Sequence, residues 1–301
     1  MAQQHTWSKT NLELFSQCPR QWFLKYGRPK KKSDAIRPST RLSHRDISIR
    51  IARRVLYEWL EDHKNGSLWS NHFKRQQIRD ITEFMFSSLK LHLEPFQTTS
   101  LINTIEQWID SLLHHPWLGK VRKQSTSWLF FPRTESIEKH GNILYCAPDI
   151  VVYEQGVWTC LRVQFSPFVY NETTHLETMS MGIWALERPF MTEATANIRI
   201  RNISLDRHQW RGVEFECGDV LLERTQKLIE YDIAAMRDVK NEVLLSKSLN
   251  VLPLAKHPRI CKSCPHIDVC PASKGLVEAK LEQQVLALHD LKQSKFRNKV
   301  G

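Results

Sequence analysis

The spacing of apolar side chains changes near residue 120, and this change constrains the fold more than any other feature. Between residues 44 and 118 apolar side chains recur at helical intervals, as in Ile47, Ile51 and Val55. That pattern predicts three helices, closed by a turn over residues 114–119. After residue 120 short β-rich runs alternate with helical stretches. The order predicts an α/β fold with a helical part ahead of its core.

The second half of the chain predicts a specific order of elements. We expect a strand over 127–133, a hairpin of 142–153 with 157–165, a helix over 172–187, a strand over 196–205 and a long helix over 218–246. A polar helix over 276–291 and a basic tail follow.

The first residues carry a different pattern. Residues 8–26 predict a short aromatic helix that breaks around Cys18-Pro19, and residues 27–43 predict a basic loop. We therefore expect one compact domain with three parts. These are an N-terminal helix and basic loop (1–43), a helical part (44–119) and an α/β core with a basic tail (120–301).

Positive charge is concentrated at the start of the chain. Residues 1–60 hold 13 Lys and Arg against 4 Asp and Glu, a net charge of +9, while the whole chain has +11. A local basic field is typical of nucleic-acid binding proteins. The alternative is a solvated face or loop, above all for Lys30–Lys32. No run reaches the roughly 18 apolar residues of a membrane-spanning helix, and the opening lacks a secretion-signal pattern. We expect a cytoplasmic protein without a membrane partner.

Seven cysteines are present, and three of them lie close together. Cys261, Cys264 and Cys270 fall within ten residues, a spacing that lets one loop direct several thiolates at an iron–sulfur cluster or at zinc. The fourth ligand would be His266, as in a zinc knuckle, or the distant Cys18. The alternative is a set of buried thiols without a metal. The remaining three lie in strand-like sequence and are expected in the core: Cys146, Cys160 and Cys217.

Both ends of the chain resemble a known family. The opening LFSQCPRQWFLKYG, the α/β core and the closing CKSCPHIDVC resemble the iron–sulfur branch of the PD-(D/E)XK nuclease superfamily. That branch includes the RecB-like CRISPR adaptation nucleases and the nuclease domain of AddB. The resemblance implies a restriction-endonuclease-like core, a central mixed sheet flanked by helices, with a C-terminal iron–sulfur motif. It also implies a 4Fe-4S cluster bound by Cys18, Cys261, Cys264 and Cys270.

The nuclease motifs of that family are changed in this chain. The family places one carboxylate at a strand end and a second on the next strand, two residues before a Lys. The carboxylates hold Mg²⁺, and the Lys helps to activate water. Asp149 matches the first carboxylate. Arg162 stands where the second acid belongs, and Gln164 stands where the Lys belongs. Because a Mg²⁺ site needs oxygen ligands, these exchanges predict a lost metal site, with Arg162 paired to Asp149.

Other positions leave an active enzyme open as an alternative. The family's metal-ligating His falls near Arg53, and His44 is the nearest histidine upstream. A migrated acid could come from Glu177 or Glu172, or from Glu154 in the hairpin turn. With such a rearranged site the protein would be a Mg²⁺- or Mn²⁺-dependent DNA exonuclease or endonuclease.

The expected function is that of a DNA-binding iron–sulfur protein without catalysis. It would act as a subunit or adaptor of a prokaryotic DNA-processing or defence complex, beside a helicase or another nuclease, on single strands or duplex ends. A third possibility is a protein that only binds other proteins and in which the cluster has a purely structural role. The expected phosphate contacts are Arg20, Lys25, Arg28, Lys30, Lys31, Lys32 and Arg53.

Overall fold

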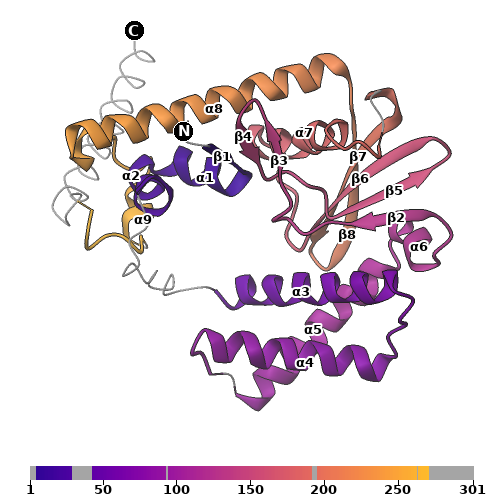
Figure 1. Cartoon of the computed structure of the whole chain (residues 1–301). Coiled ribbons are helices and arrows are strands. Elements are labelled where there is room, and N and C mark those ends of the chain that lie inside the picture. Colours follow the sequence, from indigo (N-terminus) through magenta and orange to yellow (C-terminus); the bar gives the residue numbers. More distant parts are fainter. Residues whose placement is uncertain (1–4, 29–42, 93, 192–194, 263, 271–301) are drawn as a thin grey trace, which may run out of the picture. The chain divides into compact units, whose positions relative to one another are not determined.

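The computed structural model describes residues 5–28, 43–92, 94–191, 195–262 and 264–270 (Figure 1). The chain divides into two compact units. The sheet unit comprises residues 1–9 and 41–230, and the cysteine unit comprises residues 10–40 and 231–301. The boundary at residue 230 falls inside helix α8 (Asp219–Ser246). The three-part division expected from the sequence stays a prediction.

The sheet unit is built on a five-stranded mixed sheet. Its strands lie in the order β2 (Ser127–Phe130), β5 (Ile150–Glu154), β6 (Val157–Gln164), β7 (Ile198–Asp206) and β8 (Gln209–Glu216). Neighbours are antiparallel except β6 and β7, which run parallel. Helix α7 (Glu172–Leu186) connects those two strands, as a parallel pair requires a crossover.

A second, three-stranded sheet belongs to the same unit. Its order is β1 (His5–Trp7), β4 (Asn142–Leu144) and β3 (Ile137–Lys139). Strand β1 runs parallel to β4, whereas β3 runs antiparallel to it. The run 142–153, predicted as one strand, is therefore divided between two sheets.

Four helices precede or border the large sheet: α3 (His44–Lys64), α4 (Asn71–Ser88), α5 (Pro95–Leu113) and α6 (Pro116–Arg122). Helix α3 starts with a capping box, in which Ser43 and Asp46 satisfy each other's backbone N–H groups. Its apolar stripe, including Ile47 and Ile51, packs in one core with Val163 and Ile203 of the sheet. Helix α7 covers the opposite face, since a Cβ on Gly182 would lie 3.3 Å from Ile200 and alternate residues of a strand face opposite ways.

The cysteine unit combines short helical elements from the first 40 residues with others from the last part of the chain. They are α1 (Lys9–Gln17, with Lys9 assigned to the sheet unit), α2 (Pro19–Trp22), the π-helix η1 (Phe23–Gly27), the 3₁₀ turn η3 (Leu249–Val251) and α9 (Pro258–Lys262). The predicted break at Cys18-Pro19 is confirmed, because α1 ends at Gln17 and Pro19 starts α2.

Most predicted elements are present, and besides the divided run 142–153 there are further differences. The turn expected over 114–119 is instead helix α6, because Pro116 at the first helical position is preorganised for a helix. Strands β1, β3 and β8 were not predicted. The first two have only three residues each, and β8 at the sheet edge is mostly exposed, with Phe215 as its one buried residue. The predicted helix over 276–291 and the basic tail lie outside the described residues.

Across the described residues, no helix is both long enough and apolar enough to cross a membrane.

Candidate functional site

Asp149 is fixed immediately before strand β5, between two neighbouring strands. Its backbone N–H donates to the carbonyl of Leu161 on β6 at 2.9 Å, and its carbonyl accepts from the N–H of Phe131 beyond β2 at 3.0 Å. The side chain is fully buried. The pairing of three strands therefore sets the position of this carboxylate.

Both oxygens of the Asp149 carboxylate are occupied by donors from the protein. Arg133 donates from Nε to Oδ1 at 2.8 Å and from Nη2 to Oδ2 at 3.0 Å. The Val163 backbone N–H donates to Oδ2, and the Tyr57 hydroxyl donates to Oδ1, both at 2.7 Å. Arg162 Nη1 lies 3.4 Å from Oδ1. A carboxylate has about four lone-pair positions, so these groups saturate it.

This surrounding holds Asp149 in its ionised form. Burial by itself raises the pKa of a carboxyl group, but the charges of Arg133 and Arg162 and the hydrogen bonds from Arg133 and Tyr57 outweigh it. The pKa of Asp149 therefore lies well below its usual range. Burial and the neighbouring carboxylate together raise the pKa of Tyr57, which stays a neutral donor.

Glu177, on helix α7, belongs to the same group of charges. One of its oxygens lies 2.9 Å from Lys9 Nζ, and the other lies 3.8 Å from Arg162 Nε. Burial raises its pKa, but Arg162 and Lys9 outweigh that effect, so the pKa of Glu177 is lowered. Glu177 thus lies beside Arg162, as part of an ion-pair network.

Arg53, on α3, lies among the same charges. Within the described part of the chain its Nε is buried without a hydrogen-bond partner. Burial, and to a smaller degree repulsion from Arg133, lowers the pKa of Arg53. We call the six residues Lys9, Arg53, Arg133, Arg162, Asp149 and Glu177 the arginine centre. It holds four cationic groups and two carboxylates, and all six residues belong to the sheet unit.

A buried amide lies next to Arg162. Asn202 is the register partner of Arg162 on β7, and it is only 1% exposed. Among the residues that the structure describes, neither its Oδ1 nor its Nδ2 has a hydrogen-bond partner. Gln164, two residues along β6 from Arg162, is also buried. The β6–β7 face near Asp149 is therefore polar as well as buried.

The sequence identified part of this centre and missed another part. Asp149, Arg162 and Glu177 are brought together, and the expected pair between Arg162 and Asp149 is present. Arg133 and Tyr57 were missed. The only signal for Arg133 was its place at the end of the strand predicted over 127–133, and using that signal requires knowing that β2 pairs with β5.

The other candidate acids and the candidate histidine lie elsewhere in the unit. Glu154 is the last residue of β5, at the opposite end of that strand from Asp149, and it pairs with Lys120. Glu172 is exposed at the start of α7, and His44 is exposed at the start of α3.

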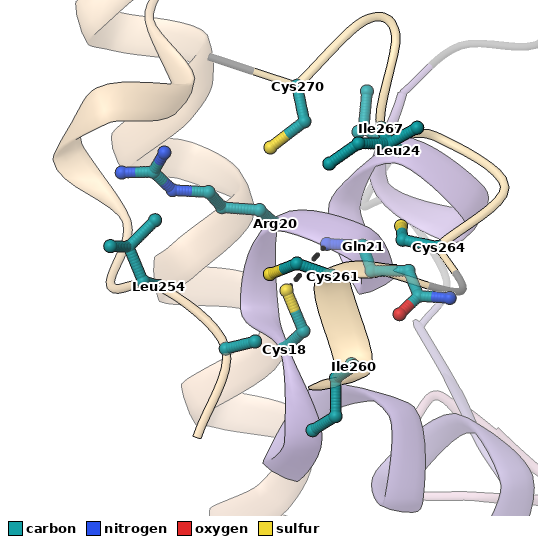
Figure 2. A pocket seen from close by; sticks show the side chains of 11 residues that line it. Cys18, Arg20, Gln21, Leu24, Leu254, Ile260, Cys261, Cys264, Ile267 and Cys270 are labelled. Carbon is teal, nitrogen blue, oxygen red and sulfur yellow. Dashed lines mark hydrogen bonds between the residues drawn. The ribbon is translucent and has the colours of Figure 1, made fainter. Parts of the chain in front are cut away.

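In the cysteine unit, four thiols line one pocket. They belong to Cys18, Cys261, Cys264 and Cys270, which Figure 2 shows around the pocket with Arg20 and several aliphatic side chains. Cys18 precedes α2 and accepts a hydrogen bond from the Gln21 backbone N–H at 3.4 Å. Burial, with a further contribution from the other three thiols, raises the pKa of Cys264.

The donor set of this pocket fits an iron–sulfur cluster. His266, the alternative fourth ligand, is not among the residues that line it. Within the described parts of the chain, no three His, Cys, Asp or Glu side chains converge on a single metal ion. A four-iron cluster takes each thiolate on a separate iron, so its ligands need not converge in that way. Cys146 and Cys160 are buried and Cys217 is half-buried, outside this pocket.

The predicted phosphate contacts have different surroundings. Arg20 does not fit the prediction of a phosphate contact, because its side chain is buried. Its guanidinium donates to the carbonyls of Leu252 at 2.9 Å and Asn250 at 3.4 Å. Lys25 is exposed and lies over the ring of Tyr26, and Arg28 is partly exposed. The run Lys30–Lys32 lies outside the described residues.

Comparison with known proteins adds little to this geometry. No protein-family model matches the chain, and no curated protein matches it. Among solved structures, one named "Crystal structure of SSO0001" is similar over 74% of this chain and 97% of its own, with 11% identity and a TM-score of 0.28. Such a score carries no argument about fold or function.

Proposed function

We propose that this protein is a DNA-binding member of the iron–sulfur PD-(D/E)XK nucleases that has lost its catalytic metal site. The observation that carries the proposal is the saturated carboxylate of Asp149. In place of a divalent cation, this carboxylate faces Arg133 and Arg162.

The loss of metal follows from ligand chemistry. Mg²⁺ and Mn²⁺ prefer several oxygen ligands from carboxylates and water. At this centre the remaining carboxylate, Glu177, is paired with Lys9 and Arg162. A divalent cation would have to displace these cations and then lie among four positive side chains. Coulomb repulsion in a poorly solvated site opposes that exchange.

The arrangement of strands supports the family resemblance. Asp149 directly precedes β5, and β6 beside it carries Arg162 and Gln164 two residues apart. This is the relative placement that the family's acid and acid-x-Lys motifs require. We infer a nuclease-like core from that placement together with the mixed sheet and its flanking helices.

The four-cysteine pocket supports the iron–sulfur assignment. Cys18, Cys261, Cys264 and Cys270 would hold the cluster. When bound, a 4Fe-4S cluster would connect the start of the chain to residues more than 240 positions later. Thiolates are soft ligands that suit such a cluster, and the Gln21 N–H already points at the Cys18 sulfur.

Binding without cleavage fits the charge of the arginine centre. Four cations against two carboxylates leave a net positive charge, and the first 60 residues carry +9. Arg162 is buried in that centre, so the phosphate contacts would come from exposed basic side chains such as Lys25, and such contacts give affinity that depends on salt but not on base sequence. We propose a cytoplasmic role as a DNA-binding subunit or adaptor beside a helicase or nuclease.

One experiment decides between a binder and an enzyme. Protein purified without oxygen is incubated with Mg²⁺ or Mn²⁺ and with single-stranded or duplex DNA. We expect salt-dependent binding and no cleavage. Cleavage by the wild type that Asp149→Ala abolishes would show an active site and reject the proposal. The iron and acid-labile sulfide content of the same preparation tests the cluster separately.

A further inference from the structure

A groove in the sheet unit lies at the tip of the β5–β6 hairpin, away from the arginine centre. Its walls include Lys64, Gln124, Leu129, Tyr153, Trp158 and Phe190. Tyr153 and Asp149 are four residues apart on an extended strand, which separates them by roughly 13 Å. The mechanism proposed above does not use this groove.

Three of the side chains that line the groove form a cluster of aromatic rings: Tyr153, Trp158 and Phe190. Tyr153 and Trp158 are register partners across the hairpin, so their side chains share one face of the sheet. Their ring centroids are 4.5 Å apart, and Trp158 and Phe190 are 6.2 Å apart. Despite these contacts, Tyr153 is 41% exposed and Phe190 is 48% exposed. Exposed rings gathered in a groove mark a binding surface.

Lysine side chains lie in and beside the same groove. Lys64 lines the groove, where it donates to the Trp128 carbonyl at 2.7 Å and lies over the Trp128 ring. Helix α6 lies next to β2 in Figure 1, and its Lys120 pairs with Glu154 at the end of β5. Thr126, just before β2, donates to the Tyr153 carbonyl. Lys123, next to the groove residue Gln124, is exposed. The border is thus net positive.

We propose that this groove binds a single-stranded nucleic acid, with one or two unstacked bases on Tyr153 and Phe190. The proposal rests on the proposed DNA binding and deepens it. Aromatic side chains stack on any base, whereas nearby cations attract the phosphates. A duplex keeps the faces of its bases covered, so an intact duplex would gain nothing from these rings.

The test compares matched aromatic variants. Fluorescence anisotropy measures binding of a labelled oligothymidine of about 12 nucleotides, a length within the range of single-strand sites, and of a blunt duplex. We expect Tyr153→Ala and Phe190→Ala each to weaken single-strand binding about five- to 150-fold, the effect of losing one stacked base. Duplex binding should be unchanged. Phe84→Ala, which removes another exposed ring of the sheet unit, is the control and should bind like the wild type.

A second variant tests the phosphate contact. Lys123→Ala should lower the magnitude of the slope of log affinity against log salt by about 0.7 for the single strand. Circular dichroism and thermal unfolding confirm that each variant is folded.

The outcomes separate this inference from the proposed function. If the wild type binds no DNA even at low salt, the proposed function fails, and the groove proposal fails with it. If the wild type binds DNA, but both aromatic variants bind the single strand as tightly as the wild type does, only the groove proposal is overturned. The groove proposal would also be overturned if the aromatic variants lost the same factor of affinity for the single strand and for the duplex.

Discussion

Arg133 and Asp149 form a bidentate ion pair immediately before strand β5 of the large sheet. Arg133 donates to both carboxylate oxygens, at 2.8 and 3.0 Å, and its Nη2 also donates to the Val163 carbonyl at 2.7 Å. The N–H of the same Val163 donates back to Asp149. The pair therefore joins the segment after β2, the start of β5 and the end of β6. Bidentate, charge-assisted hydrogen bonds of this kind are both strong and directional.

Removing the charge of Asp149 should strongly destabilise the protein. Asp149→Asn leaves Arg133 and Arg162 without a full counter-charge in a buried place, and breaking a buried pair typically costs about 3–5 kcal/mol of unfolding free energy. Urea denaturation measures the change. The control is Asp206→Asn, since Asp206 faces the exposed Arg211 at 3.4 Å, and exposed pairs contribute at most about 1 kcal/mol. Equal losses in the two variants would contradict a structural role of Asp149.

Stability should fall in acid because of the same groups. The pKa values of Asp149 and Glu177 are lower in the folded protein than usual, so the folded state favours their ionised forms. Their contribution is complete above the ordinary carboxyl pKa of about 4. It is lost as the pH falls below that value toward the folded pKa values. Unfolding free energy measured from pH 7 downward should show this decline, and Asp149→Asn should show a shallower one. Parallel curves would refute the assignment.

The four proposed cluster ligands should differ sharply from the other cysteines. Cys18→Ser removes one of the four thiols of the pocket, so we expect a large loss of bound iron and of visible absorbance in anaerobic preparations. Cys217→Ser, a half-buried cysteine outside the pocket, is the matched control and should keep both. Iron content per chain is the measurement. Wild-type protein that contains zinc, and keeps it in Cys18→Ser, would reject the four-cysteine assignment.

Helix α7 should tolerate no extra methyl group at Gly182. A Cβ there would lie 2.9 Å from Cys217 Sγ and 2.9 Å from Leu222 Cδ2. Alanine favours a helix interior over glycine by about 1 kcal/mol, but overpacking a core costs about 1–3 kcal/mol. We expect Gly182→Ala to lower the thermal unfolding midpoint. Gly119→Ala, in α6 with no atom near the added Cβ, should not lower it, and a stabilised Gly182→Ala would show that the two neighbours can move.

Periodicity was sufficient for most helices and for the central strands. It worked for α3, α4 and α5 because each must bury one face, and burial leaves a spacing that the sequence records. It failed for β1 and β3, whose three residues are too few to show alternation. It failed for α6 because a proline after a short polar stretch reads equally well as a turn.

The candidate site shows the same division. Asp149 and Arg162 could be placed near each other from the sequence, because adjacent strands of a hairpin bring their residues into register. Arg133 and Tyr57 could not, since their contacts with Asp149 depend on how β2 pairs and how α3 packs on the sheet. No local pattern encodes either arrangement.

The sequence by itself determined which residue types are present: four cysteines at the positions where the resembled family binds a cluster, one acid where that family has two, and an arginine in place of the second. Only the tertiary structure decided what surrounds them. It brought Arg133, 16 positions from Asp149, and Tyr57, 92 positions away, onto the same carboxylate. The physical reason is that ion pairing in a buried place depends on distances of a few ångströms, which are set by strand pairing and helix packing rather than by local preference.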